Sequence, residues 1–120
     1  MSALPRRRKP VRAEDLESEA EFSSWVVGLA RQCRWRCFHS SDSRKQVRRG
    51  DRLIMVGDPE QSGFPDWTFV RERVVFAELK RQKGRLSASQ EVWLEALREA
   101  GQEVYVWRPE DRGAIIRVLA

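Results

Sequence analysis

Two apolar runs joined by three polar residues, WTFV-RER-VVFAEL at 67–79, constrain the fold more than any other feature of the sequence. Aromatic and β-branched residues favour strands, and a polar connection of three residues favours a hairpin. With the three polar residues as the loop, Val70 pairs with Val74. The same register places Asp66 directly opposite Glu78, with Cβ atoms about 5 Å apart on one face of the sheet. The sequence therefore predicts a pair of carboxylates at one end of a hairpin.

The end of this hairpin also carries a base. Side chains alternate along a strand, so Glu78 and Lys80 share a face. Two carboxylates that lie so close repel each other unless a proton or a cation lies between them, and oxygen ligands suit Mg²⁺ or Mn²⁺. The alternative is structural: Asp66 ends a turn after Pro65, while Glu78 and Lys80 form a surface ion pair. A shift of one residue in the loop would separate the carboxylates, so the register decides between the two.

A cation held by two carboxylates beside a lysine provides the parts for hydrolysis of a phosphodiester. The cation would polarise the scissile phosphate and lower the pKa of a bound water. Lys80 would stabilise the charge that develops on the phosphate, or orient the attacking water. These residues therefore predict a metal-dependent phosphodiesterase site.

The rest of the chain predicts one α/β domain, with a mixed sheet covered by helices in the order α-β-β-β-α-β followed by a short helix. Residues 1–13 form a basic, flexible tail, and residues 14–120 form the domain. One helix is expected from Glu14 to about Gln32, because Phe22, Val26 and Leu29 are spaced as one helical face. The other elements are expected strands at 34–39, 53–56 and 103–107 and a helix at 89–100, with 40–62 otherwise a polar loop.

The charge of the chain favours a polyanionic partner. The net charge is +5, and residues 1–50 hold 12 Lys/Arg against 6 Asp/Glu. Arginine outnumbers lysine 19 to 4, which suits phosphate binding but is equally expected from a GC-rich genome. No apolar run approaches the roughly 18–20 residues of a membrane span, and the N-terminus does not resemble a secretory signal. With only Cys33 and Cys37, the expected location is a reducing cytoplasm.

Five segments, in this order along the chain, resemble the VRR-NUC branch of the PD-(D/E)XK nucleases. They are ESEAEF, GFPD, AELK, GRLSASQEVWLEALREAG and VYVWRP, and the resemblance covers about residues 15–110. It implies a restriction-endonuclease-like core and a metal-dependent DNA nuclease; small standalone members resemble Holliday-junction resolvases. The segment 40–62 is longer than the usual connection into the GxPD motif, which affects the details of DNA contact and not the core site.

The resemblance assigns roles to individual residues. Asp66 and Glu78 become ligands of Mg²⁺, for which Mn²⁺ would substitute, and Lys80 becomes the catalytic lysine. Gln90 matches the glutamine that follows the lysine motif and is expected to contact the site. Its spacing from Ser87 also fits a capping box, and both roles can coexist.

The family also uses a glutamate from the first helix, for which Glu17, Glu19 and Glu21 compete. Glu19 precedes Phe22 by three residues, which places it on the expected buried stripe, so it is the preferred ligand with Glu21 second. The alternative is that all three simply favour the N-terminus of the helix.

Six basic residues are predicted to contact DNA, at Arg44, Lys45, Arg48, Arg49, Lys83 and Arg85. The expected substrate is branched DNA, most of all a Holliday junction, cut by a homodimer without any small-molecule cofactor. An enzyme of this kind suits a phage, acting in the host cytoplasm. The alternatives are a catalytically inert DNA-binding module of the same fold, or a flap, single-strand or restriction-type nuclease.

Overall fold

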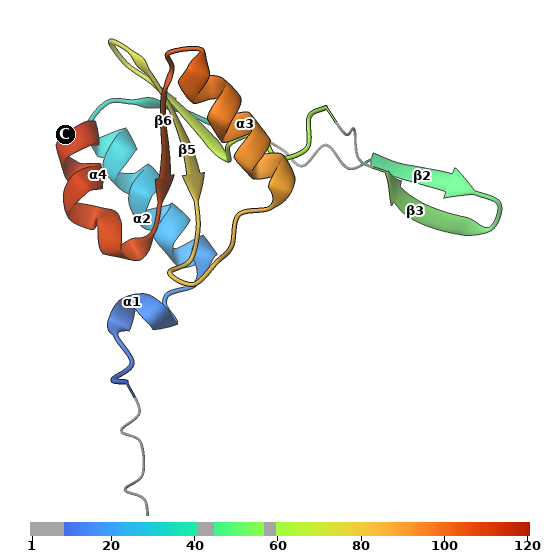
Figure 1. Cartoon of the computed structure of the whole chain (residues 1–120), viewed down its shortest axis with the longest axis horizontal. Helices are drawn as coiled ribbons and strands as arrows, with labels where there is room; N and C mark the ends of the chain where they lie inside the picture. Colours follow the sequence, from blue (N-terminus) through green and yellow to red (C-terminus); the bar gives the residue numbers. More distant parts are fainter. Residues whose placement is uncertain (1–8, 41–44, 57–59) are drawn as a thin grey trace, which may run out of the picture.

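A mixed four-stranded sheet forms the centre of the protein (Figure 1). The computed structural model describes residues 9–40, 45–56 and 60–120. The strand order is β1-β4-β5-β6, with β1, β4 and β5 antiparallel and β6 parallel to β5. The strands are β1 (Arg36–His39), β4 (Trp67–Val70), β5 (Val74–Leu79) and β6 (Glu103–Trp107). The predicted α/β class, with a mixed sheet between helices, is confirmed.

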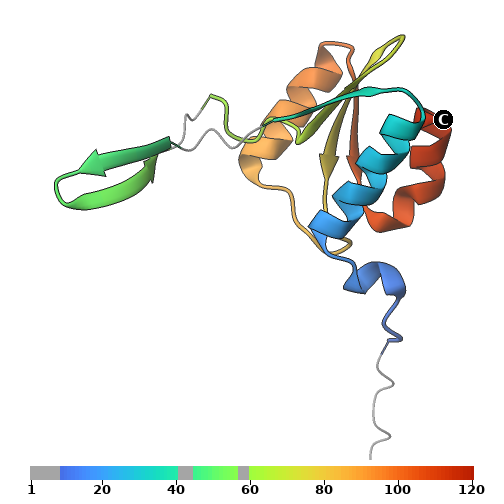
Figure 2. The ribbon, with the colours of Figure 1, turned by 180° about the vertical axis from the view of Figure 1, so that it is seen from behind.

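Helices cover both faces of the sheet (Figure 2). Helices α2 (Glu19–Gln32) and α4 (Arg112–Leu119) lie on one face, and α3 (Ala88–Glu99) lies on the other, against β6. The main core lies under α2 and α4, where side chains such as Phe22, Phe69 and Leu79 are fully buried. None of the helices in the described ranges is long and apolar enough to cross a membrane.

The hairpin register agrees with the sequence prediction. Val70 pairs with Val74, and the ladder continues to Trp67 opposite Ala77. The next positions along the two strands are Asp66 and Glu78, which therefore lie side by side where the ladder ends. Because the pairing is fixed by the buried face of β5, a slip of one residue would expose its apolar side chains.

The N-terminal helix is interrupted, contrary to the expectation of one helix from residue 14. A short α1 (Ala13–Leu16) ends before Ser18, whose Oγ accepts a hydrogen bond from the Glu21 backbone N–H at 3.1 Å. This N-cap starts α2 at Glu19. Ser18 therefore sets which residues of this segment can face the sheet.

A second, two-stranded sheet lies within the segment expected to be mostly loop. Strands β2 (Lys45–Arg49) and β3 (Arg52–Val56) pair antiparallel and turn at Gly50, whose φ of +62° suits a tight turn. This β2–β3 ribbon, residues 45–56, projects away from the four-stranded sheet (Figure 1). Strand β3 was predicted; β2 was not, because the sequence KQVRR lacks an apolar alternation.

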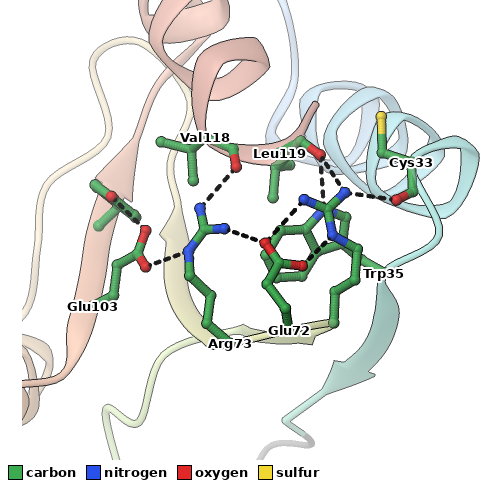
Figure 3. Close-up of polar contacts among 9 residues, drawn as sticks. Cys33, Trp35, Glu72, Arg73, Glu103, Val118 and Leu119 are labelled. Atoms are coloured by element: carbon green, nitrogen blue, oxygen red, sulfur yellow. Dashed lines mark hydrogen bonds and ion pairs between the residues drawn. The ribbon is translucent and has the colours of Figure 1, made fainter.

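The hairpin loop is tied to the end of the last helix (Figure 3). The Arg73 guanidinium donates to the Val118 carbonyl at 2.9 Å, and Arg71 donates to the Leu119 carbonyl at 3.3 Å. Both guanidinium groups lie over the ring of Trp35, at 4.4 and 5.1 Å from its centroid. The expected C-terminal helix is present as α4, and these donors satisfy carbonyls at its end. We call this set of contacts the loop clamp.

Candidate active site

Asp66 and Glu78 lie against each other where β4 begins and β5 ends. The Asp66 backbone N–H donates to Glu78 Oε2 at 3.2 Å, and the Leu79 N–H donates to Asp66 Oδ2 at 3.2 Å. Each carboxylate thus accepts a backbone hydrogen bond from the neighbouring strand. These bonds replace ladder hydrogen bonds and allow two acids to occupy an otherwise apolar hairpin.

Glu78 is the only charged side chain that is buried among the described residues, with 1% of its surface exposed. Its Oε1 lies 3.6 Å from Lys80 Nζ and accepts a hydrogen bond from Gln90 Nε2 at 2.9 Å. Burial, and then the negative charge and hydrogen bonding of Asp66, raise the pKa of Glu78 well above its usual range, while Lys80 opposes that shift. The two carboxylates therefore favour an added positive charge between them.

A divalent cation fits this donor set. Hard cations prefer carboxylate oxygens, and Mg²⁺ keeps several waters, so it needs only one or two carboxylates from the protein. Asp66 and Glu78 would hold the cation. In the part of the chain that the structure describes, no group of three or more His, Cys, Asp or Glu side chains comes together for a metal. The site thus depends on two carboxylates, with water or substrate oxygens completing the coordination.

Both the oxygen and the nitrogen of the Gln90 side-chain amide form hydrogen bonds. Its Oε1 accepts a hydrogen bond from the Ser87 backbone N–H at 2.9 Å, while Ser87 Oγ accepts one from the Gln90 N–H at 3.2 Å. This capping box starts α3, and the amide nitrogen remains available for Glu78. Gln90 therefore both caps α3 and contacts Glu78, so the two roles considered from the sequence coexist in the structure.

Gly63 allows the loop that carries Asp66 to lie on the N-terminus of α3. Its φ is +87°, and a Cβ at this position would lie 2.4 Å from the carbonyl carbon of Ser89. Only glycine fits this close backbone approach. Sequence reasoning did not assign it a role, although the first residue of GFPD is the signal that could have shown it.

Ser40 is a second neighbour of the site that the sequence did not indicate. Its backbone N–H donates to the Asp66 carbonyl at 2.8 Å. Its hydroxyl is buried and has no hydrogen-bond partner within the described residues. Ser40 stands in a polar stretch without periodicity, so no sequence signal distinguishes it.

Glu19 does not join the carboxylate pair, and the prediction that it lies on the buried stripe is wrong. It is the first residue of α2 and is exposed, because the buried stripe begins one turn later at Phe22. Glu21 is also exposed. Glu17 lies outside the helix and is half-buried in an ion pair, with its Oε2 2.7 Å from Arg112 Nη2.

The predicted DNA-contacting residues fall into two places. Lys83 and Arg85 are exposed in the connection from β5 to α3, where Arg108 Nη2 donates to the Gly84 carbonyl at 2.7 Å. Lys45, Arg48 and Arg49 belong to β2 of the ribbon. Arg44 lies outside the described residues.

The residues of this site lie in a segment that matches a known family. The VRR-NUC domain family matches residues 55–110, just under half of the chain, and the match includes Asp66, Glu78, Lys80 and Gln90. Searches of curated proteins and of solved structures found no match. A VRR-NUC domain implies a nuclease of the PD-(D/E)XK type, for which DNA is the implied partner and divalent metals are the usual cofactors.

Replacing Gln90 by glutamate separates the two hydrogen bonds of its side chain. Glutamate keeps an oxygen for the Ser87 N–H but replaces the donor to Glu78 with a third carboxylate. A hydrogen bond to a charged group contributes about 1.5–3 kcal/mol, so we expect Gln90→Glu to cleave DNA roughly 10- to 100-fold more slowly. Single-turnover cleavage rates and urea unfolding curves measure the two effects.

Ser87→Ala is the matched control, because it removes the cap and leaves the contact with Glu78. It should cost about 1 kcal/mol of unfolding free energy while changing the cleavage rate by less than about twofold. If the cleavage rates of both variants simply follow their loss of stability, Gln90 acts only as a helix cap.

Proposed function

We propose that this protein is a Mg²⁺-dependent, structure-selective DNA endonuclease whose main substrate is the four-way junction. The observation that carries the proposal is the contact between Asp66 and buried Glu78, with Lys80 Nζ 3.6 Å from the Glu78 carboxylate. A buried pair of acids costs stability unless something compensates its charge. A cation-binding catalytic site explains why the hairpin keeps both acids.

Each residue of this cluster has a distinct role in the proposal. Asp66 and Glu78 hold Mg²⁺, or Mn²⁺ in its place, which when bound polarises the scissile phosphate and activates a water. Lys80 places its ammonium beside the position of that phosphate, where negative charge develops. Gln90 holds Glu78 in place through its amide. Glu19 is left out of the proposal, because it lies exposed at the start of α2.

DNA is held by basic residues around this site. Lys83 and Arg85 follow the catalytic strand closely in sequence, and we propose that they contact the phosphate backbone together with Lys45, Arg48 and Arg49 of the ribbon. Recognition through such backbone contacts depends on the shape of the DNA and not on its sequence. Arg44 remains part of the proposal from its place in the sequence alone.

Paired cuts across a four-way junction require two active sites. We therefore propose a homodimer of the domain at 14–120, with the tail at 1–13 adding non-specific attraction for DNA. The free Cys33 and Cys37 are compatible with action in the cytoplasm, which for a phage-encoded enzyme is that of the host.

An inert DNA-binding module of the same fold is the main alternative. The presence of Asp66, Glu78 and Lys80 together argues against it, because a module that only binds DNA has no use for a buried acid pair. Flap, single-strand and restriction-type nucleases use the same chemistry and differ in substrate. Cleavage of a panel of substrates separates all of these.

The test compares four DNA substrates of matched sequence: a four-way junction, a flap, a duplex and a single strand. With Mg²⁺, we expect paired symmetric cuts in the junction at a rate at least tenfold above the other three, and no cleavage in EDTA. If the flap or the single strand is cut faster than the junction, that structure is the main substrate and the junction is not. Junction binding without any cleavage would favour the inert module.

A further inference from the structure

The sheet face that carries Asp66 and Glu78 is only partly covered by a helix. Helix α3 lies on this face against β6, while β1 is the outer strand at the opposite edge of the sheet. Phe38 in β1 is 65% exposed, and Val70 and Val74 of the hairpin are 37% and 39% exposed. Exposed apolar patches mark sites of interaction. The part of this face away from α3 therefore offers an open apolar surface.

The strand register places Phe38 beside the carboxylate pair. Phe38 pairs with Thr68, and Ser40 further along β1 donates its backbone N–H to the Asp66 carbonyl at 2.8 Å. Side chains alternate along a strand, so Phe38, Ser40 and Asp66 share a face. Phe38 is thus a diagonal neighbour of Asp66, at a distance of about 7–8 Å between backbones, which is within reach of an aromatic side chain. An exposed ring lies next to the proposed metal ligands.

The strand that carries this ring is also basic. Arg36 precedes Phe38 by two residues on the same face and is exposed, and residues 22–41 contain three arginines and no acid. Sites for unpaired nucleotides combine positive charge for the phosphates with aromatic rings for the bases. In the proposed function the scissile phosphate lies at Asp66 and Glu78, so the bound DNA passes this ring.

Only an unpaired base can use such a ring. In a continuous duplex both faces of each base are covered by its neighbours, whereas at a branch point, a bulge or a flap one face of a base is open. Stacking on an aromatic ring accepts every base, because each base has a π-face. A contact of this kind distinguishes DNA structures without reading their sequence.

We propose that Phe38 stacks on an unpaired base within about two nucleotides of the scissile phosphate, and that this contact selects branched DNA. Arg36 contacts the phosphate backbone on the same face. The inference deepens the proposed function and rests on it for the position of the scissile phosphate. The stacking contact itself requires neither the metal nor cleavage.

The first test measures DNA binding in EDTA, so that a failure of nuclease activity cannot affect the result. A duplex with one unpaired thymine is compared with the fully paired duplex of the same sequence. We expect the intact protein to prefer the bulged duplex. Phe38→Ala should weaken that binding by about 5- to 100-fold, the usual effect of losing one base–aromatic stack, and change binding of the paired duplex by less than about twofold. Phe38→Tyr keeps a ring and should retain the preference.

Ile116→Ala is the matched control for Phe38→Ala. Ile116 is 45% exposed on α4, which covers the opposite face of the sheet, so its variant should bind both duplexes as the intact protein does. The salt dependence of binding should be the same for Phe38→Ala and the intact protein, because stacking releases no counterions. Equal binding of both duplexes by the intact protein, or an equal loss on both for Phe38→Ala, would overturn the proposal. So would a change in self-association of Phe38→Ala without DNA, which would assign this surface to a second copy of the chain.

The second test locates the base. The unpaired thymine is replaced by 5-iodouracil, which forms a photo-cross-link with an aromatic ring stacked on it. We expect a cross-link to the peptide that contains Phe38, lost in Phe38→Ala and kept in Ile116→Ala. A cross-link that persists in Phe38→Ala contradicts the proposal.

Cleavage with Mg²⁺ separates this inference from the proposed function. If no DNA is cut although Phe38 cross-links to the base, the nuclease assignment fails and the base contact stands. If Phe38→Ala cuts branched DNA as fast as the intact protein does, the nuclease assignment stands and the role of Phe38 in selecting branched DNA is wrong.

Discussion

Lys80→Ala is expected to slow DNA cleavage by about 100- to 1000-fold, the usual effect of removing one group that stabilises charge in a transition state. Lys80 is held at the end of β5, with only 13% of its side chain exposed and Nζ 3.6 Å from Glu78. The chemical step is measured under single-turnover conditions, with protein in excess of DNA.

Lys83→Ala is the matched control for Lys80→Ala. It removes the same charge three residues further along the chain, where the side chain is exposed. It should weaken DNA binding a few-fold and leave the single-turnover rate nearly unchanged, since a contact with the backbone positions DNA without taking part in the chemistry. If both lysine variants lose the same amount of rate, or if Lys80→Ala cuts as fast as the intact protein, the assignment of Lys80 is wrong.

Gly63→Ala is expected to have the largest effect on stability, a loss of roughly 2–4 kcal/mol of unfolding free energy. The added Cβ would lie 2.4 Å from the Ser89 carbonyl carbon and 2.6 Å from the Gln90 nitrogen, and both are backbone atoms that cannot rotate away. The loop must therefore move off the N-terminus of α3. Because this loop carries Asp66, cleavage should fall together with stability.

Gly101→Ala is the control that measures backbone strain without the steric clash expected at position 63. Gly101 also has a positive φ, of +78°, but a Cβ there would have no neighbour within 4 Å. Its variant should cost about 1–2 kcal/mol, the strain of a left-handed residue alone, and retain full activity. Urea unfolding monitored by tryptophan fluorescence compares the two. Equal losses of stability would show that the close approach at Gly63 is relieved cheaply.

Local sequence determined the hairpin, and this is why Asp66 and Glu78 could be placed together in advance. The loop of three residues fixes the register, and the buried alternation of β5 keeps it. The capping contact of Gln90 was equally accessible, since a capping box depends on spacing alone, whereas its contact with the site was expected from the family resemblance. In such cases the determining interactions lie within a few residues of each other.

The wrong predictions concern local structure that depends on contacts between residues far apart in the sequence. The break before α2 accompanies an ion pair between Glu17 and Arg112, which are 95 residues apart, so no local pattern indicates this contact. Strand β2 forms because β3 pairs with it, although its own sequence is polar. The close approach of Gly63 to Ser89 likewise depends on how the loop meets a helix that follows 25 residues later.

The loop clamp makes the alignment of the two acids depend on a helix that does not touch them. Arg71 and Arg73 close the hairpin at the end opposite Asp66 and Glu78, and they bind carbonyls at the end of α4. Detachment of α4 would therefore free the closed end of the hairpin and let its strands shear past each other. Amide protons of α4 and of the hairpin loop at 71–73 should exchange with solvent as one cooperative unit, and an opening of α4 would loosen the alignment of Asp66 with Glu78 while the sheet stays folded.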